Sequence, residues 1–218
     1  MLLFSSKEIS LLKKLNTPVK VQDFLNTFSF NFEKKGETLK SPLFTLRAKN
    51  MHCFEGALLG AYILSLHGFT PYLLHLKSTR DDYDHVIAPF KQGGLWGALS
   101  KTNHAVLRYR EPIYKNIREL CMSYFHEYFL NNGEKTLRQY SELFNLNNFK
   151  QQWSTHRQDL WGIDKKLDKI KHYDIFPKDH IRKLRKADKI EINAGKIVEY
   201  PSNGTNSRKS KRYCKKQG

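Results

Sequence analysis

The chain has 218 residues, 39% of them hydrophobic, and a formal net charge of +17 at pH 7. This length suits one domain, or one domain with an appendage, and is sufficient to bury a core. The three cysteines, Cys53, Cys121 and Cys214, are odd in number, lie far apart and lack Cys-x-x-Cys spacing, which argues against a disulfide framework and against structural zinc.

The N-terminal apolar run covers only residues 1–4. It is too short for the core of a signal peptide and far too short to span a bilayer. We therefore expect a cytoplasmic protein without a membrane span, and the sequence indicates no cofactor.

Two short helices are expected at the N-terminus. Ser5 and Glu8 have the spacing of a capping box at the start of the first helix. Pro18 interrupts that helix, and a second one is expected to end near Phe28. Residues 31–50 are polar and predict a long loop with at most a short helical turn.

The most apolar stretch, residues 53–67, predicts a helix buried on nearly all faces, with Gly68 as a left-handed residue at its end. Strands are expected at residues 71–76, 85–90 and 95–99, the last two joined by a turn at Gly93-Gly94. Pro89 cannot donate to a strand ladder, so we expect its strand to be bulged or near an edge on one side.

Beyond Pro112, apolar residues repeat at intervals of three and four over residues 113–129 and predict an amphipathic helix. The helical pattern extends over residues 137–144 and reappears over residues 149–161. A short strand is expected at residues 196–200. Helix, strands and helices in this order predict an α+β fold in which the buried helix packs on a small antiparallel sheet with flanking helices.

The same pattern suggests three parts: a domain over residues 1–160, a basic helical extension over residues 161–200, and a disordered basic tail over residues 201–218. Residues 165–218 contain 17 Lys or Arg and 6 Asp or Glu, which is +11 of the net +17. The basic side chains of the tail have two expected roles. They bind polyanions, nucleic acid included, or they only keep the chain soluble. These are Lys209, Lys211, Arg212, Lys215 and Lys216.

Cys53 stands at the predicted N-terminus of the buried helix, where free backbone N–H groups and the helix dipole favour a thiolate. The plainer interpretation is a small buried hydrophobe, which also suits Cys121. His85, at the start of a strand some thirty residues later, is a suitable base for a cysteine nucleophile. The histidines His52, His67 and His75 are not excluded by their positions.

A cysteine that opens a buried helix, followed by Asp84-His85-Val86 on a strand and by the Gly93-Gly94 turn, resembles the core of the transglutaminase-like, papain-like cysteine superfamily. The resemblance covers residues 49–103, about a quarter of the chain. It implies Cys53 as the nucleophile and His85 as the general base and later acid. The implied reaction is acyl transfer at an amide through a thioester, by a peptidase, an amidase or a transglutaminase-like enzyme with a peptide or amide substrate.

The third catalytic position departs from the family pattern. Family spacing expects an acidic residue fifteen or sixteen residues after the histidine, where this chain has Ser100 or Lys101. Asn103 is the nearest amide able to orient His85, Ser100 is a weaker substitute, and Asp82 or Asp84 could approach from the other side. Without an orienting carboxylate, a binding protein with degraded catalysis on the same scaffold is the alternative.

Two further functions are expected near the cysteine. Asn50 or His52, with the Cys53 backbone N–H, could form an oxyanion site. Trp96 could line a wall of the substrate site, or simply fill the core.

The acidic turn at residues 81–84 lacks the glycine and distal glutamate of a calcium loop, so no metal site is expected. The third hypothesis is a nucleic-acid-binding module in which Cys53 is only core.

Overall fold

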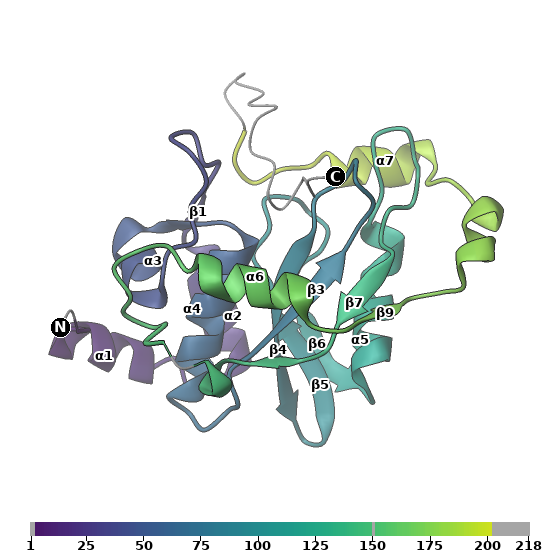
Figure 1. Cartoon of the computed structure of the whole chain (residues 1–218). Helices are drawn as coiled ribbons and strands as arrows, with labels where there is room; N and C mark the ends of the chain where they lie inside the picture. Colours follow the sequence, from purple (N-terminus) through teal and green to yellow (C-terminus); the bar gives the residue numbers. More distant parts are fainter. Residues whose placement is uncertain (1–2, 150, 202–218) are drawn as a thin grey trace.

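The computed structural model describes residues 3–149 and 151–201 (Figure 1). The strands are β1 (Ser29–Phe30), β2 (Asn50–Met51), β3 (Tyr72–Lys77), β4 (His85–Gln92), β5 (Leu95–Leu99), β6 (Arg110–Tyr114), β7 (Gln139–Ser141), β8 (Phe144–Asn145) and β9 (His172–Asp174). The α-helices are α1 (Ser6–Lys13), α2 (Pro18–Asn26), α3 (Pro42–Ala48), α4 (Cys53–Ser65), α5 (Ile117–Met122), α6 (Trp161–Lys169) and α7 (Lys189–Gly195).

Seven strands form one antiparallel sheet in the order β6-β5-β4-β3-β7-β9, with β8 paired to β3 as well. The two short strands β1 and β2 pair separately, in parallel. The helices α1 to α4 gather on one side of the large sheet, and α5 lies on the other (Figure 1). The predicted α+β class is confirmed.

The central helix α4 is the predicted buried helix, and its residues Phe54 to Leu64 are buried except Tyr62. It packs against β4, α2 and α3. Two of its glycines allow close approach, because a Cβ at Gly56 would lie 2.6 Å from Cβ of Lys101 and one at Gly60 would lie 2.7 Å from Cδ1 of Leu99. The segment after β5 therefore runs directly against the N-terminal half of α4.

The hairpin of β4 and β5 also has the predicted form. Gly93 and Gly94 adopt positive φ angles of 57° and 83°, as a tight two-residue turn requires. The β3–β4 ladder ends at the pair Leu74 and Ile87, so Pro89 lies beyond it and needs no donor on that side. Alternate strand residues divide between two apolar clusters, with Val86 on the α4 side and Ile87 on the α5 side.

The long helix predicted over residues 113–129 is wrong in extent. Its first residues belong to β6, and α5 begins only after Asn116, whose side chain accepts a hydrogen bond from the Glu119 N–H. A short 3-10 turn, Phe125–Glu127, follows. The spacing of three and four still identified a buried face, because most apolar side chains of this stretch pack in one buried cluster, although Ile113 is exposed.

Three other predictions near the C-terminal half fail. Residues 137–144 form β7 and part of β8 because they complete the edge of β3. Between Phe149 and α6, which begins at Trp161, the described residues 151–160 contain no helix. The strand expected at residues 196–200 is reduced to one bridge between His104 and Val198. Apolar spacing alone did not distinguish a half-buried edge strand from a helix here.

The segment at residues 161–200 is integrated with the rest of the chain. Ile163 and Leu167 of α6 belong to the same apolar cluster as α4, and β9 adds a strand beside β7. The basic residues expected to bind polyanions, Lys209 to Lys216, lie outside the described residues. Within the described part of the chain, no helix has both the length and the apolar character needed to cross a bilayer.

Candidate active site

Cys53 is the first residue of α4 and is partly exposed. Burial raises the pKa of its thiol, but hydrogen bonds from His52 and His85 and the charges of both imidazoles outweigh this, and the pKa falls to about 5. The helix N-terminus adds partial positive charge at the same place. Cys53 is therefore a thiolate near neutral pH, the form that acts as a nucleophile.

His85 reaches the thiol from the start of β4, and its side chain is buried at 5% exposure. Its Nε2 lies 2.8 Å from Oγ of Ser100. The Ser100 hydroxyl donates its proton to the Leu107 carbonyl at 2.5 Å, so toward His85 it accepts. The proton of a neutral His85 ring is thereby fixed on Nε2, and Nδ1 is left to exchange a proton with the thiol.

The Ser100 main chain is fixed by the side-chain amide of Gln22 on α2. The amide accepts a hydrogen bond from the Ser100 N–H at 3.0 Å and donates one to its carbonyl at 2.8 Å. The Leu107 carbonyl is also held in place, because Leu107 has a φ of 60° and its N–H donates to Glu127 Oε2 at 2.6 Å. A left-handed leucine costs about 1 kcal/mol, and the surrounding hydrogen bonds maintain it.

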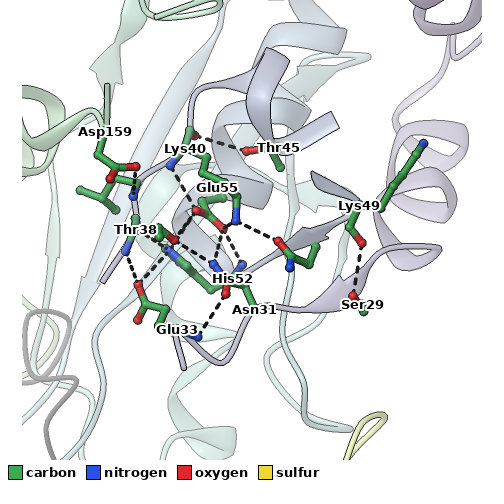
Figure 2. Close-up of polar contacts among 12 residues, drawn as sticks. Ser29, Asn31, Glu33, Thr38, Lys40, Thr45, Lys49, His52, Glu55 and Asp159 are labelled. Atoms are coloured by element: carbon green, nitrogen blue, oxygen red, sulfur yellow. Dashed lines mark hydrogen bonds and ion pairs between the residues drawn. The ribbon is translucent and has the colours of Figure 1, made fainter. Parts of the chain in front are cut away.

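His52 precedes Cys53 and lies in a buried polar network that Figure 2 shows. Its Nε2 donates to the Thr38 carbonyl at 2.8 Å and lies 3.6 Å from one carboxylate oxygen each of Glu33 and Glu55. Burial favours the neutral ring, but Glu55, the thiolate of Cys53 and Glu33 outweigh it and raise the pKa of His52 to about 9. His52 is thus an imidazolium at neutral pH, fixed beside the thiolate.

Glu55 is the centre of this network (Figure 2) and its side chain is fully buried. Its carboxylate accepts hydrogen bonds from the backbone N–H groups of His52 and Lys40 and from the Thr38 hydroxyl, and it pairs with Lys40 Nζ at 3.1 Å. Burial alone would raise the pKa of Glu55, but the charges of His52 and Lys40 and these hydrogen bonds lower it. Glu55 therefore stabilises both the first turn of α4 and the charge on His52.

The structure brings together Cys53, His52, His85 and Ser100, and it separates two other candidates from them. Asn103, the first choice for orienting His85, instead binds the main chain of Tyr200 through both atoms of its amide, each at 2.9 Å. The Ser100 position, one residue beyond the end of β5, is what brings its hydroxyl to the His85 ring.

Asn50 and Trp96 have different outcomes. The Asn50 side-chain oxygen accepts from Lys40 Nζ at 2.9 Å. This contact uses the acceptor of the amide and not its N–H groups, so the expected role of Asn50 as an oxyanion donor stays a prediction. Trp96 pairs with Lys91 at the far end of the hairpin, six residues along β4 from His85, which is roughly 20 Å at the rise of a strand. Its role as a wall of the substrate site is therefore corrected, and it packs with Tyr72 instead.

The acidic turn before β4 does not orient His85 either. Asp84 pairs with His75 at 3.0 Å and accepts from the Ser78 N–H, while Asp82 accepts from the Thr136 hydroxyl. His67 lies at the opposite end of α4, near the Leu12 carbonyl. Among the described residues, no group of three or more His, Cys, Asp or Glu side chains is arranged to hold a metal ion.

Three contributors were missed in the sequence: Gln22, Glu55 and Thr38. Gln22 sits on the apolar side of an amphipathic helix beside Val21 and Leu25, and Glu55 is the third residue of a very apolar helix. A polar residue on a buried face requires a partner, and that was the available signal. Thr38 lies in a stretch interpreted only as loop and gave no signal.

No protein-family model matches the chain, and no curated protein matches it either.

Proposed function

We propose that the protein is a cysteine-dependent acyl-transfer enzyme of the transglutaminase-like superfamily that acts on amide bonds through a Cys53 thioester. One observation carries the proposal: the Cys53 thiol opens the buried helix between two imidazoles, and one of them, His85, is oriented from behind by Ser100. A lowered thiol pKa is typical of a cysteine nucleophile, whereas a cysteine that only packs in the core does not need one.

In the first half of the reaction, the Cys53 thiolate attacks the amide carbonyl carbon, and the C=O electron pair moves to oxygen. The first N–H groups of a helix have no partner within the helix, so the Cys53 N–H can bind this oxyanion, and the fixed charge of His52 adds to its stabilisation. The tetrahedral intermediate collapses with cleavage of the C–N bond. His85 gives its Nδ1 proton to the leaving amine.

In the second half, water or an amine attacks the thioester and loses its proton to His85. The C–S bond breaks, and the thiolate and the imidazolium are restored. The acyl donor is a peptide or another amide. We place this activity in the cytoplasm, where the thiol pool keeps cysteines reduced. Polyanion binding by the basic tail would be an addition to this function.

The experiment is site-resolved alkylation with iodoacetamide in a Cys214→Ser protein, read by mass spectrometry from pH 4 to pH 10. Cys53 is expected to react half-maximally at about pH 5. Cys121 is the internal control, because burial raises the pKa of its thiol and it is 0% exposed. The proposal fails if Cys53 reacts only above pH 8, as an ordinary thiol does.

A further control separates reactivity from catalysis. Release of an amine from a panel of glutamine and peptide amides is measured for the Cys214→Ser protein and for its Cys53→Ala and His85→Ala variants. Both variants are expected to lose the activity and the acyl-enzyme mass. Turnover that persists in Cys53→Ala would exclude the thioester route.

A further inference from the structure

The last described residues, 196–201, return to the loop that follows Ser100. They lie along residues 103–105, which follow Ser100 by only a few positions. The Glu199 N–H donates to the Asn103 carbonyl at 2.8 Å, and the Ala105 N–H donates to the Ile197 carbonyl at 2.9 Å. His104 and Val198 form an antiparallel bridge between these two bonds. Residues 197–199 therefore pair through their main chain with the edge of a loop, residues 103–105 between β5 and β6, at one isolated antiparallel bridge.

Asn103 reinforces this seat with its side chain. Its amide donates to the Tyr200 carbonyl and accepts from the Tyr200 N–H, both at 2.9 Å. One planar amide that satisfies both polar groups of one peptide residue recognises main chain without regard to the side chain. Asn103 is 5% exposed, so the clamp belongs to a built and buried surface.

The side chains of the segment indicate what this edge selects. Ile197 and Val198 are 62% and 40% exposed, so they contribute little to the seating. Glu199 instead faces two cations, with its Oε2 3.7 Å from Arg108 Nη2 and 4.0 Å from Lys101 Nζ. Lys101 also lies 5.9 Å from the centre of the Tyr200 ring. The recognised chemistry is an acidic side chain followed by an aromatic one.

The buried side chain of Lys101 distinguishes the contact with Glu199 from an ordinary surface ion pair. Its side chain is 1% exposed, and its Nζ donates to the Phe28 carbonyl at 2.6 Å. Its Cβ lies against Gly56, one turn from Cys53 in α4. A buried ammonium requires compensation, and in the described residues Glu199 is the carboxylate within 4.0 Å of it.

We propose that residues 101–108 form a binding edge for an acidic peptide next to Ser100, the residue that orients His85, and that residues 197–200 of the same chain occupy it as an internal pseudosubstrate. That this peptide is the acyl donor rests on the proposed function. The binding itself does not. The segment buries little apolar surface and is held by a few hydrogen bonds and partly exposed charges, so a peptide in trans can replace it.

The test uses the full chain with Cys53→Ala, so that no acylation occurs. A labelled peptide with the sequence of residues 196–201, Lys-Ile-Val-Glu-Tyr-Pro, is titrated by fluorescence anisotropy. Glu199→Gln weakens the binding of residues 197–200 to the edge, so a larger fraction of the edge is open. The affinity for the labelled peptide should therefore rise at least about fivefold. A peptide with Gln in place of Glu should bind the same protein about tenfold more weakly.

Two variants control the experiment. Adding Asn103→Ala to Glu199→Gln, in which the edge is already mostly open, should weaken binding of the peptide by up to about tenfold, since the added peptide loses the clamp. Adding Ile197→Thr at an exposed side chain should leave the affinity unchanged. Circular dichroism checks that each variant is folded. Equal affinity of the Glu and Gln peptides, or no tightening in Glu199→Gln, overturns the proposal.

The outcome is separable from that of the proposed function. Peptide binding together with an unreactive Cys53 would support the binding edge and contradict the proposed acyl-transfer activity. A reactive Cys53 without peptide binding would support the activity and contradict the binding edge.

Discussion

Nε2 of His85 and Oγ of Ser100 lie 2.8 Å apart, where the superfamily resemblance predicts a carboxylate or an amide. A hydroxyl fixes the direction and the tautomer of the imidazole but adds no negative charge. The charge is found on the other side of the thiol, where Glu33 and Glu55 flank His52. In a Cys-His-Asp arrangement, one aspartate both orients the imidazole and stabilises its positive charge. Here Ser100 orients the His85 ring, whereas Glu33 and Glu55 stabilise the charge on the second histidine, His52.

The role of Ser100 can be tested by Ser100→Ala. The variant removes the acceptor for His85 Nε2, so the ring loses its fixed orientation. We expect the rate of Cys53 alkylation at pH 4, below the pKa of the thiol, to fall about fivefold to tenfold, equivalent to about 1–1.5 kcal/mol for one hydrogen bond. The rate is measured under pseudo-first-order conditions on the Cys214→Ser background.

Ser100→Thr provides the matched control, because it keeps the hydroxyl and should retain most of the rate. A Ser100→Ala protein with the wild-type rate would show that His85 is oriented by something else. A loss common to both variants would point to damaged packing near Leu107 rather than to the hydrogen bond.

The sequence was sufficient to predict the part of the site that depends on local pattern. A very apolar run predicts α4, so Cys53 at its start follows, and the Gly93-Gly94 turn fixes the hairpin that carries His85. The third position depends on where the chain goes after β5, which is set by close packing of Lys101 on Gly56 and by the amide of Gln22. Such contacts link residues far apart in sequence and leave no local pattern.

Glu55 is a buried carboxylate that compensates the positive charges of Lys40 and His52, so Glu55→Gln tests the polar network around it. The pKa of Glu55 is lowered in the folded state, so its ionisation contributes stability above the ordinary value of 4.5, and this contribution is lost as pH falls through the folded value. At pH 7 we expect a loss of about 3 kcal/mol in the free energy of unfolding, since His52 and Lys40 lose their shared counter-charge.

Urea unfolding of the two proteins at pH 7 and at pH 4 measures this. The difference between them should shrink at the lower pH. Glu134→Gln, at an exposed carboxylate, is the control and should change the free energy of unfolding by less than about 0.5 kcal/mol. Equal stability of Glu55→Gln and wild type at pH 7 would contradict a compensating role for Glu55.

The thiolate and the imidazolium make opposite contributions to the pH dependence of stability. The pKa of His52 is raised from 6.5 to about 9, so its contribution is complete below pH 6.5 and is lost as pH rises through 9. The pKa of Cys53 is lowered from 9 to about 5, so its contribution is complete above pH 9 and is lost as pH falls through 5. Between pH 6.5 and 9 the two slopes cancel.

Cys53→Ser removes one of these slopes, because the serine hydroxyl does not ionise in this range. The free energy of unfolding of wild type is expected to be nearly flat from pH 6.5 to 9, while that of Cys53→Ser falls by about 1–2 kcal/mol. Urea unfolding at half-unit steps of pH provides the comparison. Parallel curves for the two proteins would mean that the thiol and His52 do not share charge.

Close packing between α4 and the segment that carries Ser100 makes Gly56→Ala a test of site geometry. The new Cβ would lie 2.6 Å from Cβ of Lys101, which is too short for two such atoms, so the segment after β5 must move away from the helix. We expect a loss of about 1–3 kcal/mol of stability from overpacking. Because Ser100 precedes Lys101, the same shift should separate its hydroxyl from His85 and slow alkylation of Cys53.

Gly60→Ala, one turn further along α4, is the matched control. Its new Cβ meets Cδ1 of Leu99, the end of a flexible side chain that can rotate away, and no residue of the site lies there. This variant should alter stability less and leave the alkylation rate of Cys53 unchanged. If Gly56→Ala loses stability but keeps the full rate at pH 4, the packing of α4 on residues 100–101 does not set the position of Ser100, and another contact, such as that of Gln22, must do so.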